Sequence, residues 1–214
     1  MENSLLANLR KDYQSKLLDE KSINVNPLQQ FETWFDEAIE SKLPEPNAMT
    51  IATCGIDFKP SARIVLLKGI ENGSFLFYTN YQSRKGKELL WNPYAALLFF
   101  WNELHRQVRI EGRVEKTSSE ISDAYFESRP FGSQLSALVS PQSEIIQDRD
   151  WLEEKLDIAR KQFDPNPLKR PRQWGGYRLI PNSFEFWQGR PNRLHDRILF
   201  TQIANGWKME RLGP

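Results

Sequence analysis

The chain has 214 residues, enough for one domain with its own hydrophobic core, so we expect residues 1–214 to form a single domain. Its 29 basic and 28 acidic side chains give a net charge of +1, which argues against nucleic-acid or membrane-surface partners, and the single cysteine excludes a disulfide framework and a cysteine-rich zinc site. We expect no metal, and the polar N-terminus without a long apolar run predicts a soluble cytoplasmic protein.

Helical patterns come first along the chain. Residues 5–18 fit a loose amphipathic helix. Residues 27–41 fit a firmer one, in which Pro27 suits the first turn. Its expected buried stripe consists of Phe31, Trp34, Phe35, Ala38 and Ile39.

Strand signals then follow in quick succession and are separated by short turns. We predict strands over residues 48–54, 62–70, 75–80, 94–101 and 106–116, with a short helix over 84–91 interrupting the series. Closely spaced strands joined by hairpin-like turns indicate a mostly antiparallel sheet that curls into a barrel.

A helical insert and a final group of strands complete the chain. The expected helices cover residues 118–128, a short piece after Gly132, and residues 147–162, and a loop over 164–172 follows. The expected strands cover residues 176–180, 184–188, 195–201 and 207–212.

The sequence has neither a Gly-x-Gly-x-x-Gly turn nor a P-loop, so a phosphorylated ligand must be held by cationic and hydroxyl side chains and helix N-termini. The run Arg63-Ile-Val-Leu-Leu-Lys68 places two cations at the ends of an aliphatic strand. Residues five apart point to opposite faces unless a bulge intervenes. The alternative is a core strand with solvated ends.

A second candidate is the start of the helix over residues 84–91. Ser83 can cap this helix, and Arg84 and Lys85 lie in its first turn, where cations oppose the helix dipole. A bound phosphate would relieve that conflict. The alternative is a helix start exposed to solvent.

A third candidate consists of Tyr125, Arg129 and Ser133. Tyr125 and Arg129 are one helical turn apart, Pro130 ends that helix, and Ser133 can cap the next one. A guanidinium, a hydroxyl and free N–H groups would then surround one point and could hold phosphate. The alternative is a helix-turn-helix corner with an exposed arginine.

The fourth candidate lies near the C-terminus. If residues 195–201 and the residues just before them are extended, Arg193, His195 and Arg197 share one face and Leu194 and Asp196 the other. Like charges side by side repel one another unless anions lie between them. Trp187 could add an aromatic wall to this group.

These motifs, in this order, resemble the pyridoxine 5′-phosphate oxidase family over residues 9–214. The resemblance is carried by Arg63–Lys68, Phe77-Tyr-Thr-Asn80, Ser83-Arg-Lys85, Arg106-Gln-Val108, Ser128-Arg-Pro130 with Ser133-Gln134, Gln142-Ser143, Trp174-Gly-Gly176, and Phe186-Trp-Gln-Gly189 through Arg193-Leu-His-Asp-Arg197.

The resemblance implies a mostly β (α+β) FMN-binding split β-barrel with flanking helices and a homodimer with FMN at the subunit interface. By motif, the implied FMN contacts are Arg63, Ile64, Val65, Leu66, Leu67, Lys68, Tyr78, Thr79, Arg84, Lys85, Gln107, Gln142, Ser143, Trp187 and Arg197. The implied substrate contacts are Lys68, Tyr125, Arg129, Ser133, Arg193, Leu194 and His195, with Arg10 and Tyr13 from a flexible segment, residues 1–26, that covers the active site.

The resemblance also implies oxidation of pyridoxine 5′-phosphate and pyridoxamine 5′-phosphate to pyridoxal 5′-phosphate, with hydride transfer to FMN and reduction of O2 to H2O2. Arg193 and His195 would be the catalytic residues, over the pyridine ring. Three alternatives stay open: a related flavin oxidase acting on another substrate, such as a phenazine; a non-catalytic protein that binds FMN or pyridoxal phosphate; and a nucleic-acid module.

Overall fold

The computed structural model describes residues 17–163 and 168–214, and its backbone falls into two compact units. The terminal unit holds the described residues up to Met49 together with Leu97–Ile110 and Asn182–Pro214. The central unit holds Thr50–Ala96 and Glu111–Pro181. The organisation as a single domain stays a prediction. The helix predicted over residues 5–18 lies, up to residue 16, outside the described part of the chain.

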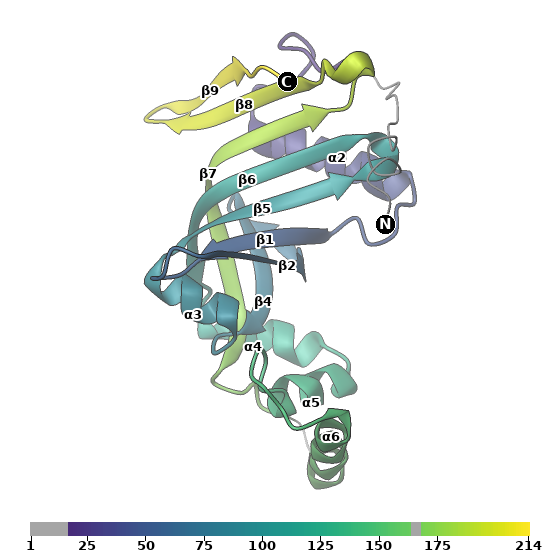
Figure 1. Ribbon diagram of the computed structural model, residues 1–214, viewed down its shortest axis with the longest axis vertical. Helices are drawn as coiled ribbons and strands as arrows, with labels where there is room; N and C mark the ends of the chain where they lie inside the picture. The colour runs from purple at the N-terminus through teal and green to yellow at the C-terminus, as the bar shows by residue number, and fades with distance from the viewer. Residues whose placement is uncertain (1–16, 164–167) are drawn as a thin grey trace, which may run out of the picture. The chain divides into compact units, whose positions relative to one another are not determined.

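In the described residues the strands form one sheet (Figure 1), in the order β2-β1-β5-β6-β7-β4-β3 with β8 on β7 and β9 on β8. Their bounds are β1 Ala48–Cys54, β2 Pro60–Leu66, β3 Gly69–Glu71, β4 Ser74–Asn80, β5 Tyr94–Trp101, β6 Arg106–Lys116, β7 Trp174–Gln188, β8 Asp196–Ile203 and β9 Gly206–Arg211. The strand pairs β3–β4, β4–β7, β7–β8 and β8–β9 are antiparallel, which confirms the predicted sheet type.

The described helices follow the predicted pattern closely. They are α2 Pro27–Glu40, α3 Arg84–Trp91, α4 Ser119–Ser128, α5 Phe131–Val139 and α6 Arg149–Phe163, with 3-10 turns η1 at Asn102–Leu104 and η2 at Pro191–Arg193. The Asn26 side chain caps α2 by accepting from the Leu28 N–H, and Pro27 stands in the first turn as predicted. None of the described helices is both long enough and apolar enough to cross a membrane.

Two strand predictions were wrong. The strand predicted over residues 62–70 is divided: β2 ends at Leu66, and the Lys68 N–H donates to the Leu76 carbonyl, which starts the β3–β4 hairpin. The strands predicted over 176–180 and 184–188 are one strand, β7, which pairs with β4 up to Leu179 and with β8 from Ser183. Pro181 lies where β7 changes partner, a position where its missing N–H breaks neither of these two ladders.

Aromatic packing builds the core of the terminal unit. From α2, Phe31 meets Phe99 of β5 with ring centroids 5.0 Å apart, and Trp34 meets Phe186 of β7 at 5.3 Å. Phe31 is fully buried, whereas Ile39, which the periodicity placed in the same stripe, is 51% exposed. The stripe is therefore narrower than predicted and ends with Ala38.

In the central unit a smaller cluster joins the helices to the start of β7. It consists of Phe126, Leu135, Ala137, Ala159, Leu168 and Trp174. Beside it, Gly176 lies opposite Tyr78 in the β4–β7 register. A Cβ at position 176 would come within 2.9 Å of the Tyr78 ring and 2.5 Å of the Thr117 hydroxyl, so the absence of a side chain leaves room for both.

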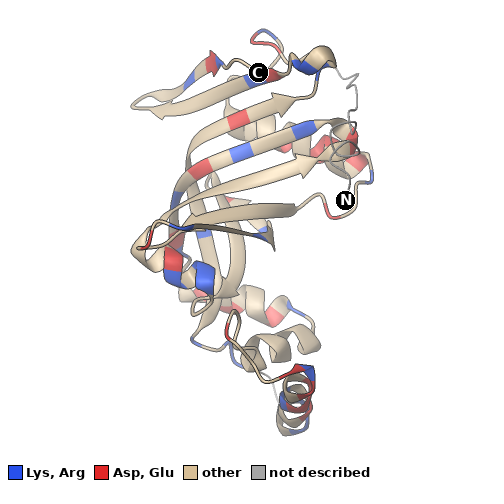
Figure 2. Cartoon of the chain, viewed as in Figure 1, with Lys and Arg blue, Asp and Glu red and all other residues tan. Residues whose placement is uncertain are grey.

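Acidic and basic residues are interspersed along β6, β7 and α6 (Figure 2). The interspersed charges agree with the net charge of +1. Charge distribution alone therefore does not mark a binding site, and each Lys or Arg side chain has to be judged by whether a carboxylate pairs with it.

Candidate functional site

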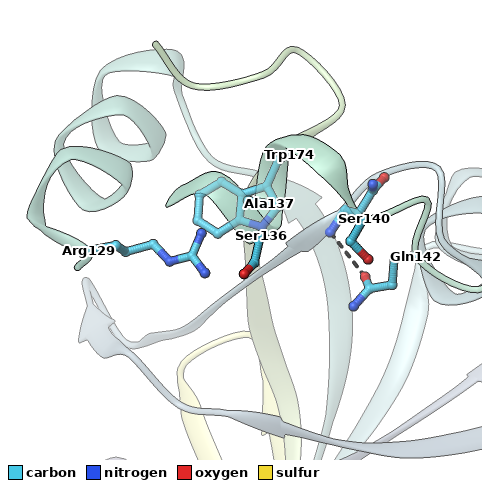
Figure 3. A pocket seen from close by; sticks show the side chains of 7 residues that line it. Arg129, Ser136, Ala137, Ser140, Gln142 and Trp174 are labelled. Carbon is cyan, nitrogen blue, oxygen red and sulfur yellow. Dashed lines mark hydrogen bonds between the residues drawn. The ribbon is translucent and has the colours of Figure 1, made fainter. Parts of the chain in front are cut away.

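The central unit contains a cavity of about 190 Å³ at the meeting point of β4, the α4–α5 corner and the start of β7 (Figure 3). It is lined by Asn80, Arg129, Ser136, Ala137, Ser140, Gln142 and Trp174. Two of these, Arg129 and Gln142, are predicted site residues, and Figure 3 shows them on either side of Trp174.

Arg129 brings a positive charge to this cavity. Its guanidinium lies over the Trp174 ring, 4.6 Å from the centroid. Its Nη1 atom is buried, and among the described residues it has no hydrogen-bond partner and Arg129 has no ion pair. Burial lowers the pKa of Arg129, but an arginine keeps its charge in proteins. A buried donor without an acceptor is costly, so this group is suited to an anionic ligand.

Stacked aromatic rings support Arg129. Tyr78 and Tyr125 stack with centroids 3.7 Å apart, and Tyr125 lies nearly parallel to Trp174, with centroids 6.2 Å apart and an interplanar angle of 6°. Burial raises the pKa of Tyr78 to about 12, so its phenol stays protonated at neutral pH. Trp174 thus brings together Tyr125 and Arg129, two members of the predicted trio. Tyr78, predicted as an FMN contact, stacks on Tyr125.

The reason given for this cluster from sequence was partly wrong. α4 ends at Ser128, and Arg129 has an extended backbone, so Arg129 and Tyr125 do not share a helical face. Ser133 does not cap α5 either, because the helix begins earlier, at Phe131, with Pro130 in the N-cap position. Ser133 lies within the first turn and is not among the residues that line the cavity.

The start of α3 holds a second predicted group. The Ser83 hydroxyl accepts from the Gly86 N–H, which confirms the predicted cap. Lys85 is only 6% exposed, and its Nζ lies 3.1 Å from Thr79 Oγ1 and 3.4 Å from Gln142 Oε1. Burial first, and then the nearby Arg63, lower the pKa of Lys85 to about 8. In the described part of the chain no carboxylate forms an ion pair with Lys85.

Arg63 and Arg84 converge on one carboxylate beside Lys85. The Glu88 carboxylate accepts from Arg84 Nε at 2.8 Å and lies 3.4 Å from Arg63 Nη2. Arg63 also donates to Thr53 Oγ1 at 2.5 Å and to the Ser61 hydroxyl. Arg63, Arg84 and Lys85 together with Glu88 give this cluster a formal net charge of +2.

The remaining residues of the run after Arg63 have mixed positions. Val65 and Leu66 are half-buried, Leu67 is buried, and Ile64 is 64% exposed. Lys68 follows the end of β2 and is exposed. Because it does not belong to the same strand as Arg63, the predicted placement of the two side chains on opposite strand faces does not apply. Ser143 is exposed in a left-handed conformation (φ 72°), next to Gln142.

In the terminal unit, His195 packs against Trp187. Their ring centroids are 4.7 Å apart, and His195 Nδ1 accepts from the Arg190 backbone N–H at 3.1 Å. Burial and the charge of Arg193 lower the pKa of His195. The neutral ring therefore carries its proton on Nε2, the only nitrogen left to donate.

Arg197 is opposite Trp187 in the β7–β8 register. Its Nε donates to Glu185 at 2.8 Å, and Nη1 donates to the Gly213 carbonyl at 2.7 Å. Glu185 also pairs with Arg109 at 2.7 Å. Gln107 lies in β6 and is half-buried.

The prediction that Arg193, His195 and Arg197 share one strand face was wrong. β8 begins only at Asp196, and Arg193 belongs to the 3-10 turn η2. Asn192 and Arg193 are left-handed (φ 56° and 61°), which breaks the alternation. Arg193 and Leu194 are exposed. Arg10 and Tyr13 lie outside the described residues.

Two residues of the candidate site, Trp174 and Glu88, were not predicted from the sequence. Trp174 is the platform for Arg129, but the sequence only showed it in a Trp-Gly-Gly motif. Glu88 was not singled out, although a carboxylate four residues after Arg84 on one helix is a recognisable pairing signal.

Comparison with known proteins shows which family the chain resembles. Residues 35–162 match the family model described as pyridoxamine 5′-phosphate oxidase, and residues 174–214 match the pyridoxine 5′-phosphate oxidase C-terminal dimerisation region. A pyridoxine/pyridoxamine 5′-phosphate oxidase of Burkholderia mallei (strain SAVP1) is 56% identical over 98% of this chain and 99% of its own length. One of Acaryochloris marina (strain MBIC 11017) is 52% identical over 98% and 95%.

Solved structures agree on the fold. PhzG from Burkholderia lata 383, in complex with tetrahydrophenazine-1-carboxylic acid, matches with a TM-score of 0.87 and 28% identity over 94% of this chain and 99% of its own. An FMN-binding protein of Nostoc punctiforme related to pyridoxamine 5′-phosphate oxidase matches with a TM-score of 0.69 at 16% identity, over 86% and 97%. The predicted split-barrel class with flanking helices is confirmed.

Proposed function

The chain belongs to the pyridoxamine 5′-phosphate oxidase family, and from this premise we propose that it oxidises pyridoxine 5′-phosphate and pyridoxamine 5′-phosphate to pyridoxal 5′-phosphate. FMN would be the cofactor and O2 the final electron acceptor. The observation that carries the proposal is the buried Nη1 of Arg129, a cationic donor without an acceptor in the described residues. A phosphate on the substrate would accept a hydrogen bond from this N–H.

The cluster at α3 fits the phosphate of FMN. Arg63, Arg84 and Lys85 carry three positive charges against the single carboxylate of Glu88. A phosphate monoester carries about 1.5 to 2 negative charges at pH 7, which matches this excess. Thr79 and Gln142 add a hydroxyl and an amide next to Lys85.

When bound, FMN supplies the hydride acceptor and passes the electrons on to O2, which leaves as H2O2. Arg129, Tyr125, Ser133 and Lys68 would hold the substrate phosphate. His195, neutral because its pKa is lowered, would present its Nε2 proton to the 3′-oxygen side of the pyridine ring. Arg193 would supply positive charge on that side.

We further propose a homodimer with FMN at the subunit interface, because residues 174–214 match a dimerisation region. Residues 1–26, with Arg10 and Tyr13, would cover the substrate. All of these elements would belong to a single domain.

A second candidate is oxidation of a tricyclic phenazine precursor, favoured by the structural match to PhzG in complex with tetrahydrophenazine-1-carboxylic acid. A carboxylate could also bind Arg129. An aerobic assay of the FMN-loaded protein separates the two functions: we expect pyridoxal 5′-phosphate and H2O2 from pyridoxine 5′-phosphate, and no oxidation of tetrahydrophenazine-1-carboxylic acid. The reverse result would assign the phenazine function, and flavin binding without turnover of either would leave a non-catalytic binder.

A further inference from the structure

Glu88 lies at the centre of the cationic cluster, although it does not itself suit an anionic ligand. Its carboxylate accepts from Thr53 Oγ1 at 2.5 Å, from Ser61 Oγ at 2.6 Å and from Arg84 Nε at 2.8 Å. Arg63 Nη2 lies 3.4 Å away. One side chain thus links β1, β2 and the first two turns of α3.

The carboxylate is charged despite its burial. The Glu88 side chain is 10% exposed. Burial alone would raise its pKa, but the hydrogen bonds from Ser61, Thr53 and Arg84 lower the pKa to about 2. A negative charge is therefore present beside the proposed phosphate site at every physiological pH.

Such a charge has two opposite effects on a phosphate. It repels the ligand, and it also fixes the two guanidinium groups that would bind it. Arginine side chains lose much rotational freedom when they are ordered, so a site that orders them in advance spares the ligand that loss. Because Glu88 contacts Arg63 and Arg84 directly, the second effect has an evident structural basis here.

We propose that Glu88 is a positioning residue that holds Arg63 and Arg84 in place for the phosphate of the flavin cofactor. This role rests on the proposed FMN site and assigns to it a residue that does not touch the ligand. It predicts that removing the carboxylate weakens phosphate recognition, even though removal makes the site more positive.

The test measures the affinity of the full-length apoprotein for FMN and for riboflavin, which lacks the phosphate, by quenching of flavin fluorescence. The ratio of the two affinities isolates phosphate recognition from general damage to the flavin site. For Glu88→Gln we expect this ratio to fall about tenfold, the scale of ordering one or two long side chains, with riboflavin affinity nearly unchanged.

Glu115→Gln is the matched control. It removes a carboxylate of the same unit that pairs with Arg178 and does not touch the cluster, so its ratio should equal that of the wild type. An increase in the ratio for Glu88→Gln would show that repulsion dominates, and would overturn the proposal. An unchanged ratio, or an equal fall in Glu115→Gln, would also overturn it.

If Glu88→Gln does not fold, Glu88→Asp carries the same test, because it keeps the charge but withdraws it by one methylene from both arginines. A smaller fall in the ratio supports the role, and an unchanged or raised ratio overturns it. Failure of the FMN site itself looks different: the wild-type protein would then bind riboflavin as tightly as FMN.

Discussion

In each unit a buried glutamate lies between two arginines, Glu88 in the central unit and Glu185 in the terminal unit, but the surroundings differ. In the central unit Glu88 holds Arg63 and Arg84, and Lys85 beside them pairs with no carboxylate among the described residues. In the terminal unit Glu185, 2% exposed, holds Arg109 and Arg197. Arg197 also donates to the Gly213 carbonyl.

The difference separates two uses of arginine. Where cations outnumber carboxylates, as around Lys85 and at Arg129, the protein retains binding capacity for an anion. The Arg197 guanidinium is instead bound to the Glu185 carboxylate and the Gly213 carbonyl. It is therefore held in a fixed position next to Trp187, which packs against His195. We therefore expect phosphate recognition to depend on the central unit and ring positioning on the terminal unit.

The largest expected effect is on stability, from Glu185→Gln. Removing the buried carboxylate leaves Arg109 and Arg197 without their acceptor. Because both guanidinium groups are partly exposed to solvent, we expect a cost at the lower end of the range for a broken buried pair, about 3 kcal/mol. Urea denaturation should show this loss, whereas Glu210→Gln, in an exposed pair with Lys208, should cost less than about 1 kcal/mol. The variant should keep its preference for FMN over riboflavin; loss of that preference would break the proposed division between the units.

Next is Arg129→Gln. Losing a charge-assisted hydrogen bond of about 1.5–3 kcal/mol should lower kcat/KM for pyridoxine 5′-phosphate about 10- to 100-fold. FMN affinity should not change, and Arg149→Gln, on the exposed face of α6, should leave both quantities unaltered. Wild-type kcat/KM in Arg129→Gln would mean that the substrate phosphate binds elsewhere.

The pH dependence of FMN binding should report Lys85. Its pKa of about 8 in the free protein means that it is cationic below that pH and neutral above it. Phosphate binds the cation, so FMN affinity should be constant from about pH 7 to 8 and then fall by up to about tenfold per pH unit. Lys85→Met should bind FMN more weakly and without this fall; a fall that persists in Lys85→Met would assign it to another group.

The smallest effect is expected from His195→Gln. Because the pKa of His195 is lowered, its imidazole is neutral above pH 7 and acts there as a hydrogen-bond donor through Nε2. Glutamine keeps a neutral donor, so kcat at pH 8 should stay within about tenfold of the wild type. A larger loss of kcat would indicate that His195 transfers a proton in the reaction.

Local signals were sufficient for much of the fold. Residues 48–54, 84–91, 94–101 and 106–116 form the predicted elements with the predicted bounds, because apolar periodicity and the Ser83 cap act within a few residues. The sequence did not indicate that one long strand, β7, changes its pairing partner along its length. The merger into β7 depends on β4 and β8, which are distant in sequence from each other.

The candidate site was predictable as a set of residues rather than as a geometry. Lys85, Thr79 and Gln142 do meet, as do Tyr78, Tyr125 and Arg129, but the platform for the second group, Trp174, comes from a separate segment. The left-handed Asn192 and Arg193 are set by the turn at η2, which strand alternation cannot anticipate.

The most direct measurement is anaerobic mixing of the FMN-loaded protein with pyridoxine 5′-phosphate, followed by the loss of flavin absorbance. We predict complete bleaching with pyridoxine 5′-phosphate and none with unphosphorylated pyridoxine at the same concentration, because Arg129, whose buried Nη1 has no acceptor among the described residues, recognises the substrate phosphate. Equal bleaching by both compounds, or bleaching by neither, would contradict the account.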